Sequence, residues 1–450
     1  MRYLGLKIFA GLIILVAALF IWKWNTWFKK YPEADYICPN SPNRIIQSLG
    51  ANADYDRAIS WRCDTVPHKS FLELYDIENG VKKILPAKHK KVSTMGGKNV
   101  FYRVDLKNLQ AKDYKYRVQT GDKYSKWYKL SLNKVNNKVR FAYLGDIQDL
   151  VGGVSDTIFR HINRRFPKLD FWMFGGDCVE RPMDKYWNEF ILAGDSIFQN
   201  KPVIACTGNH EYIKALFKIL DKRWKYYWPL PKNGAKLFKG RVAHWEIEDA
   251  CIVSLDTDGV QGLATYFSQY YWAKRIFKET DKKWKIIFMH HPIKSAGKGR
   301  STIIMSTLFA NMLEEMKVDL ILQGHDHSYS RYITKEDGKL STPVYVESSC
   351  SRKFYDVVID EEADRLGSSI KLFQILDISK DTLQYKSYKL SDEIYDSFKI
   401  IKTDKGIKVI DENPKTKEHL VPTHRIKRKK TKLEEYLKEA SNRNKLKYSL

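Results

Sequence analysis

Five short apolar runs along the chain show the pattern of buried β-strands. They span residues 139–144, 169–174, 202–207, 285–290 and 318–323. Runs rich in Val, Ile, Leu and Phe that end at Gly or Pro are typical of parallel strands covered on both faces. The pattern predicts an α/β domain whose strand ends meet at one edge of a sheet, where α/β proteins place their ligands.

The segment from residue 43 to residue 137 has a different pattern. It contains short runs of alternating apolar and polar residues, separated by turns rich in Gly, Asn, Asp and Lys. Near-regular spacing of such runs predicts a small antiparallel β-sandwich, with Trp61 in its core. Nothing in this segment indicates catalysis, so we interpret it as a spacer or packing partner.

The chain begins with a long apolar run. No charged residue occurs from Ile8 to Trp22, and the lysines that flank this run can extend toward lipid headgroups. About twenty such residues are enough to cross a bilayer, and the tryptophans near its end suit the membrane interface. A cleaved signal peptide has a similar pattern, but no small-residue cleavage site follows. We predict an uncleaved signal anchor over residues 1–28 and a linker over residues 29–42.

The composition gives the chain a strong positive charge. Its 450 residues include 78 Lys and Arg against 53 Asp and Glu, a net charge of +25. Residues 404–450 form a basic tail, which is densest in positive charge at 425–432. Such a segment binds nucleic acid, anionic lipid or an acidic polymer, or is a solvated tail; we favour the solvated tail. A short terminal helix is predicted by the helical spacing of Leu433, Tyr436, Leu437 and Ala440.

The six cysteines show neither CxxC spacing nor the density of a disulfide framework. Three of them lie in or beside predicted core strands, so buried free thiols are the expected state. A disulfide between Cys38 and Cys63 is the alternative.

Each of the five apolar runs leads into a short polar motif. The motifs are GDIQ at 145–148, GGD at 175–177, GNHE at 208–211, HHP at 290–292 and GHDH at 324–327. A single motif of this kind has an ordinary structural explanation, such as a turn or a helix cap. Five of them in this order, at the ends of predicted strands, predict one site. Carboxylates, imidazoles and an amide are the groups that two metal ions held close together require.

This set of motifs resembles the calcineurin-like metallophosphoesterases, and within them the purple acid phosphatase branch. The resemblance covers roughly 139–403 and includes the segment at 268–292, the motif GHDHSYSR and the closing run DEIYDSFKII. It implies a metallophosphoesterase β-sandwich flanked by helices in residues 138–403. It also implies a fibronectin type III-like domain in residues 43–137.

The resemblance further implies a set of site residues. Asp177 takes the bridging position between two metals, and His210 is expected to act on the leaving group. The other implied metal ligands are Asp146, Asn209, His290, His325 and His327. Within this list we assign Asp146 and His327 to one metal ion and the remaining three residues to the second.

Two positions depart from the purple acid phosphatase pattern. Glu180 replaces the tyrosine that binds ferric iron in those enzymes, so a purple Fe(III) protein is not expected. Gln148 stands where the wider superfamily often has a metal-binding histidine. We expect Gln148 to supply this ligand or to orient water on the metal, with Glu180 as the competing candidate. The metal identity stays open among Mn, Fe and Zn, because ligand type alone does not choose between them.

A third departure lies in the loop after His290. Plant-type enzymes have substrate-binding histidines in this loop, whereas this chain has Lys294, Lys298 and Arg300. Arg300 is our candidate for binding phosphate oxygens through two hydrogen bonds. A solvated basic loop is the alternative.

Together these observations predict a membrane-anchored binuclear metalloenzyme that hydrolyses phosphate esters in the manner of acid phosphatases. We expect a single-pass protein of the cell membrane with its catalytic domain outside the cytoplasm; secretion after signal cleavage is the alternative. A phosphodiesterase or nucleotidase, and a non-catalytic surface binding protein, are the alternative functions. The expected partners are a phosphate ester, the membrane and an anionic surface or polymer at the tail, whereas nucleic acid is not expected.

Overall fold

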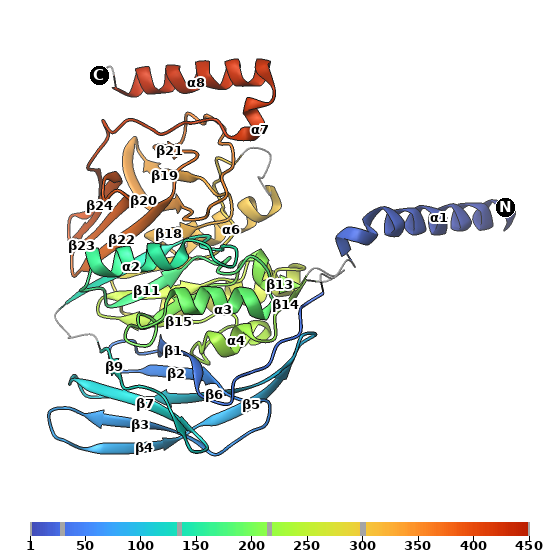
Figure 1. Cartoon of the computed structure of the whole chain (residues 1–450). Helices are drawn as coiled ribbons and strands as arrows, with labels where there is room; N and C mark the ends of the chain where they lie inside the picture. The colour runs from blue at the N-terminus through green and yellow to red at the C-terminus, as the bar shows by residue number, and fades with distance from the viewer. Residues whose placement is uncertain (1, 28–31, 133–136, 214–217, 298–302, 449–450) are drawn as a thin grey trace.

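The computed structural model describes residues 2–27, 32–132, 137–213, 218–297 and 303–448. A long N-terminal helix, α1 (Arg2–Trp27), precedes two β-rich units (Figure 1). Its stretch Lys7–Trp24 has a mean hydropathy of 1.9, and none of it is buried inside the structure. Among the described residues it is the one helix long and apolar enough to cross a membrane, although a signal sequence near an N-terminus has the same properties.

The first unit consists of two antiparallel sheets. One contains β1 (Asn43–Leu49), β2 (Arg57–Arg62), β6 (Lys98–Leu106) and β5 (Lys88–Ser93), in that order. The other contains β4 (Lys82–Pro86), β3 (Ser70–Asp76), β7 (Tyr114–Thr120) and β8 (Lys123–Tyr124), with β9 (Tyr128–Leu130) also paired to β7. Trp61 is 1% exposed in the core between them and stacks on Tyr102 at 5.5 Å. This strand order is that of immunoglobulin-type sandwiches, and the finer likeness to fibronectin type III stays a prediction.

The second unit is a mixed α/β structure built on two seven-stranded sheets. One contains β12 (Val203–Ala205), β11 (Phe171–Phe174), β10 (Lys138–Leu144), β22 (Leu372–Ser379), β23 (Thr382–Lys389), β24 (Ile394–Thr403) and β25 (Gly406–Asp411). The other contains β15 (His244–Ile247), β16 (Ala250–Ser254), β17 (Trp284–Phe288), β18 (Leu320–Gln323), β20 (Lys339–Glu347), β19 (Tyr329–Glu336) and β21 (Arg365–Gly367). Apolar side chains from both sheets form one continuous core.

The five predicted strands are present, but they are divided between these two sheets. β10, β11 and β12 run parallel in the first sheet, and β17 and β18 run parallel in the second. The single parallel sheet that the apolar runs alone suggested is therefore wrong, and β10 pairs with β22 in the antiparallel direction. The sheets flanked by helices that the family resemblance implied are confirmed. An apolar run indicates that a strand is buried but not which sheet it joins, because both sheets are covered on both faces.

Helices cover the outer faces of both sheets. α2 (Ser155–Arg165) and α3 (Asp184–Ala193) lie on the first sheet, where Phe159 makes an edge-to-face contact with Trp172. α5 (Leu263–Glu279) and α6 (Ile303–Glu315) pack on the second through a separate apolar cluster that includes Trp272 and Phe309. The shorter elements are η1 (Asn209–Glu211), β13 (Tyr212–Ile213), β14 (Ile219–Leu220), α4 (Trp224–Tyr227) and η2 (Lys236–Phe238).

Much of the C-terminal segment packs against the α/β unit. β25 pairs with β24, so the first sheet continues past the boundary expected at residue 403. α7 (His424–Lys427) and α8 (Lys430–Tyr448) follow. Tyr436 and Ala440 are buried in the apolar cluster of the second sheet, while Leu437 is exposed. The predicted terminal helix is present, and the interpretation of residues 404–450 as a wholly solvated tail is wrong.

All six cysteines are buried free thiols. The expected state is therefore confirmed, and the alternative disulfide between Cys38 and Cys63 is not formed.

A buried ion-pair cluster joins the sandwich to the α/β unit. Arg44 Nη2 lies 2.7 Å from Asp184 Oδ2, and Arg62 Nη1 lies 2.8 Å from Asp184 Oδ1. Burial opposes ionisation, but the hydrogen bonds and charges of the two arginines outweigh it and lower the pKa of Asp184. Because both arginines come from the sandwich and Asp184 begins α3, the cluster ties the two units together.

Replacing Asp184 with Ala would leave two buried guanidinium groups without their carboxylate. We expect the free energy of unfolding, measured by urea denaturation, to fall by about 3–5 kcal/mol. The control is Asp105→Ala, which breaks a more exposed pair with Arg103 in the same sandwich and should cost less than about 1 kcal/mol. Equal losses in the two variants would contradict a stabilising role for the cluster.

Candidate metal centre

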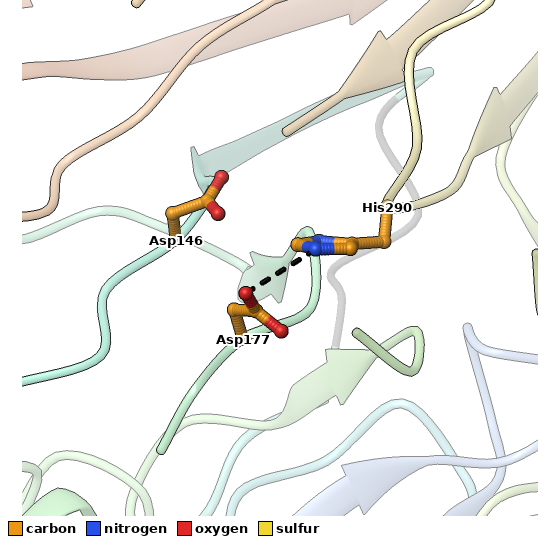
Figure 2. Close-up of side chains that lie close together, drawn as sticks. All are labelled: Asp146, Asp177 and His290. Carbon is orange, nitrogen blue, oxygen red and sulfur yellow. Dashed lines mark ion pairs between the residues drawn. The ribbon is translucent and has the colours of Figure 1, made fainter. Parts of the chain in front are cut away.

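Two aspartates and one histidine from three different strands meet at a buried point of the α/β unit (Figure 2). Asp146 follows β10, Asp177 follows β11 and His290 follows β17. One ligand atom of each lies within 4.8 Å of the others. His290 Nε2 is 3.3 Å from Asp177 Oδ2, the contact drawn as a dashed line in Figure 2. The ends of strands from both sheets thus bring metal-binding side chains to one point.

Asn209 and His325 extend this cluster on the side of His290. Asn209 Oδ1 lies 3.1 Å from His290 Nε2 and 3.0 Å from His325 Nδ1, and the two ring nitrogens are 3.2 Å apart. One amide oxygen and two imidazole nitrogens that converge in this way are a suitable donor set for a transition-metal cation. The other ring nitrogen of His290 donates a hydrogen bond to the Gly175 carbonyl at 3.1 Å, which orients the ring.

His327 and Gln148 lie on the side of Asp146. His327 Nε2 is 3.8 Å from Asp146 Oδ1, and Gln148 Nε2 is 3.4 Å from Asp177 Oδ2. Asp146 Oδ1 and Gln148 Oε1 are buried and accept no hydrogen bond from the part of the chain that the structure describes. Unpaired buried oxygens are costly in free energy, so both atoms fit a bound cation.

The electrostatics of the cluster favour a positive charge between the carboxylates. Burial, partly offset by His290, raises the pKa of Asp146 to about 7. Burial also opposes ionisation of Asp177 and His290, but their mutual attraction lowers the pKa of Asp177 and raises that of His290 well above its usual value. A metal cation can supply this positive charge in place of the histidine proton, since a histidine ligand must be neutral.

Four of these residues adopt a backbone conformation that is uncommon for residues with side chains. The angle φ is 47° at Asp146, 49° at Asp177, 82° at His325 and 46° at His327. Residues in the left-handed region cost about 1–3 kcal/mol each and cluster at functional sites. The close packing of the site also requires glycine at position 208, because a Cβ atom there would lie 2.3 Å from Asp177 Oδ1.

Glu211 holds two of the motifs together, a role that the sequence analysis did not predict. Its carboxylate accepts hydrogen bonds from the backbone N–H groups of Gly208 at 2.7 Å, Asp177 at 3.0 Å and Cys178 at 2.7 Å. Burial and the charge of Asp177 raise the pKa of Glu211 to about 8. The GGD turn is thereby fixed to the GNHE turn. The only signal in the sequence was the position of Glu211 as the last residue of GNHE.

His210 lies beside the cluster with its side chain 25% exposed. Its Nδ1 donates a hydrogen bond to the Glu180 carbonyl at 2.6 Å, and its Nε2 lies 3.9 Å from Asp177 Oδ2. The Glu180 carboxylate is 2.7 Å from Lys353 Nζ. Glu180 therefore orients His210 through its backbone, while Gln148 is the residue whose side chain reaches Asp177.

The segment that begins at His290 contains two further residues of interest, His291 and Arg300. Arg300 lies outside the described residues, so its role in binding phosphate stays a prediction.

His291 contacts the site, although no role was predicted for it. Its ring centroid is 4.3 Å from that of His325, its Nδ1 is 2.9 Å from Thr257 Oγ1, and burial lowers its pKa to about 4. A neutral His291 ring therefore packs against His325.

Known proteins resemble this chain in sequence and in fold. Residues 139–329 match the family model described as calcineurin-like phosphoesterase. Purple acid phosphatase 4 of Arabidopsis thaliana is 29% identical over 151 residues, which cover 30% of this chain and 44% of that protein. Purple acid phosphatase 3 of the same plant is 28% identical over 182 residues, which cover 35% of this chain and 50% of that protein. The chain thus matches about half the length of these relatives.

A solved structure titled "Structure of PhoD" has a similar fold. It aligns with a TM-score of 0.61 at 12% sequence identity and covers 90% of this chain and 100% of its own. Residues 139–329 thus form a domain of the calcineurin-like metallophosphoesterase superfamily, a class of phosphoester hydrolases. Within this superfamily it is related to the purple acid phosphatases.

Replacing Glu211 with Ala would remove the acceptor of four buried backbone N–H groups, those of Asp177, Cys178, Val179 and Gly208, and release the two turns. We expect the metal affinity to fall by about 10- to 100-fold, measured by equilibrium dialysis. In the control, Glu189→Ala removes a half-buried carboxylate that accepts an exposed hydrogen bond from the N–H of Gly152, and it should leave the affinity unchanged. Folded Glu211→Ala protein with undiminished affinity would contradict the positioning role.

Proposed function

We propose that the chain hydrolyses phosphate esters with two metal ions, in the manner of acid phosphatases. The phosphoesterase domain supports the class of reaction. The observation that carries the proposal is the presence of two donor sets that share Asp177. One set comprises Asp146, Gln148 and His327, and the other comprises Asn209, His290 and His325.

The surrounding residues suit this chemistry. When bound, two cations lower the pKa of water and attract charge from phosphoryl oxygens. The neutral amide of Asn209 adds no negative charge, which keeps the centre electrophilic. The Glu180 carbonyl holds the Nδ1–H group of His210, so Nε2 is the atom that can give a proton to the oxygen of the leaving alcohol.

The donor types suit Mn, Fe or Zn. In this assignment Gln148 completes the donor set around Asp146, and Glu180 takes no part in it. Because Glu180 replaces the tyrosine that gives ferric iron its purple colour, we do not expect a purple centre.

The proposed location is the cell membrane, with the catalytic domain outside the cytoplasm. The apolar stretch Lys7–Trp24 supports an anchor, and the fibronectin type III-like sandwich would act as a spacer behind it. The exposed basic run at 425–432 is the proposed contact with an anionic surface or polymer.

Catalysis is tested on the full-length protein with Mn, Fe or Zn and matched aryl phosphate monoesters and diesters. We expect metal-dependent turnover with a preference for the monoester. Asn209→Ala should lower both metal content and turnover. His210→Ala should lower kcat by about 10²- to 10⁴-fold while metal content persists.

The matched control is His68→Ala, which changes an exposed histidine of the sandwich and should leave kcat unaltered. A preference for the diester would indicate a phosphodiesterase. Folded protein that binds two ions but hydrolyses neither ester would overturn the proposal in favour of a binding protein.

The anchor is tested by membrane fractionation. We expect the full-length protein to remain in the membrane fraction after a high-salt wash, because the apolar surface of residues 1–27 is buried in the bilayer. Deletion of residues 1–27 should make the protein soluble. A protein whose N-terminal sequencing shows loss of α1, or one released by salt alone, would argue against an uncleaved anchor.

A further inference from the structure

A cavity of about 520 Å³ adjoins the metal centre on the side of His210. Asn209 and His210 form part of its lining, so it opens onto the residue that we expect to protonate the leaving alcohol. Its volume lies within the range of sites that enclose small organic molecules. Whatever alcohol leaves the phosphorus would therefore extend into this cavity.

The lining of the cavity is largely apolar. The side chains that supply this character are Met95, Pro182, Met183, Tyr212, Ile213 and Ile219. Met95 is 58% exposed and Ile219 is 53% exposed. Large apolar side chains held open to water beside a polar reaction centre are typical of a ligand-binding surface.

The charged groups of the cavity cancel one another. Three acidic residues, Glu33, Glu180 and Asp221, and three basic residues, Arg181, Lys222 and Arg223, belong to its lining. Each carboxylate is already paired, since Arg223 lies 2.5 Å from Glu33 and 3.0 Å from Asp221, and Lys353 lies 2.7 Å from Glu180. The lining residues themselves therefore carry no net formal charge.

One wall of the cavity comes from the N-terminal sandwich. Met95 lies in the turn between β5 and β6, and this turn is fastened to the chain that follows α1. The Gly96 N–H group donates to Glu33 Oε2 at 3.2 Å, and the Tyr36 N–H group donates to the Gly96 carbonyl at 2.9 Å. A Cβ atom on Gly96 would lie 2.4 Å from the Ala34 carbonyl oxygen, so the close contact requires glycine.

The same wall is fastened to the α/β unit. Glu33 accepts a hydrogen bond from the Asp184 N–H group at 2.7 Å and pairs with Arg223 at 2.5 Å. The side chains of Glu33 and Arg223 are almost inaccessible, at 4% and 2% exposed. A buried ion pair with additional hydrogen bonds has a well-defined geometry. Because Glu33 also binds the turn that contains Met95, these contacts fix the position of Met95 relative to His210.

The cavity also lies near the end of α1. Glu33 lines it, and chain length places Glu33 at most about 20 Å from Trp27, the last residue of α1. If α1 is held in a bilayer, the cavity is held close to the membrane surface, where amphiphilic molecules concentrate.

From these observations we infer that the substrate is a phosphate monoester of a bulky apolar alcohol, and that the sandwich residue Met95 helps to select it. The inference rests on the proposed hydrolysis and adds the class of leaving group. The phosphate would lie at the metal centre, and the alcohol would lie between Met95 on one wall and Ile219 on another.

The test compares two alkyl phosphates whose alcohols differ in length but hardly in acidity, ethyl phosphate and hexyl phosphate. Full-length protein in lipid nanodiscs is assayed for the ratio of kcat/KM on hexyl phosphate to that on ethyl phosphate. We expect a ratio of about ten or more, because each methylene removed from water adds to transition-state binding.

Met95→Ser should lower this ratio at least threefold. Met95→Leu keeps a large apolar side chain at this position and should give the same ratio as the unaltered protein. Ile84→Ser is the matched control, since Ile84 is a similarly exposed (56%) apolar residue of the sandwich that does not line the cavity. It should leave the ratio unchanged. Any partition of hexyl phosphate into the nanodisc is the same for every variant, so differences between variants report the cavity.

A ratio near one in the unaltered protein, or a ratio that Met95→Ser does not change, would overturn the inference while the proposed hydrolysis stands. Loss of turnover on both esters, with metals bound, would instead overturn the proposed function. Dioleoyl phosphatidic acid in the nanodisc is a second substrate that distinguishes a membrane lipid from a soluble ester. Its hydrolysis would indicate that the substrate is a membrane lipid. Hydrolysis of hexyl phosphate alone would indicate a soluble ester.

Discussion

The structure depends on the burial of several carboxyl groups at one place. Asp146, Asp177 and Glu211 are each no more than 1% exposed, and Asp177 is in contact with His290 on one side of the candidate centre and with Gln148 on the other. Buried charges of like sign are strongly unfavourable unless a cation compensates them. Among the side chains that meet them, His290 offers such a charge, and the convergent donor atoms indicate that metal ions supply the rest.

The fold around this point keeps the acidic groups together. Strands of the two sheets end close to one another at the candidate site. The turns at these strand ends adopt left-handed backbone conformations at Asp146, Asp177, His325 and His327. Glu211 ties two of these turns through backbone hydrogen bonds. Farther out, Glu33 and Asp184 attach the sandwich to the same unit, so that a domain without catalytic residues contributes a wall beside His210.

Much of the candidate metal centre could be predicted from the sequence, because each candidate ligand lies in a short motif directly after an apolar run. Asp146, Asp177 and His290 needed only that rule and the tendency of strand ends to gather ligands. The apolar runs alone did not show how the five strands divide between two sheets, because an apolar run looks the same in either sheet; the two-sheet arrangement was implied only by the family resemblance. The role of Glu211 was not predicted because its partners are backbone N–H groups. Every residue type except proline has such a group, so the sequence does not show which of them Glu211 contacts. Asp184 was missed because its partners, Arg44 and Arg62, are distant in sequence.

The role of Asp177 is tested most directly by X-ray diffraction from crystals of the metal-loaded, full-length protein, recorded at the absorption edge of Mn, Fe or Zn. We expect two anomalous peaks, about 3.5–4 Å apart, on either side of the Asp177 carboxylate. One should lie beside Asp146 and His327, and the other beside Asn209 and His290. A single peak that touches only one donor set, or no peak at Asp177 in crystals soaked with metal, would contradict this role.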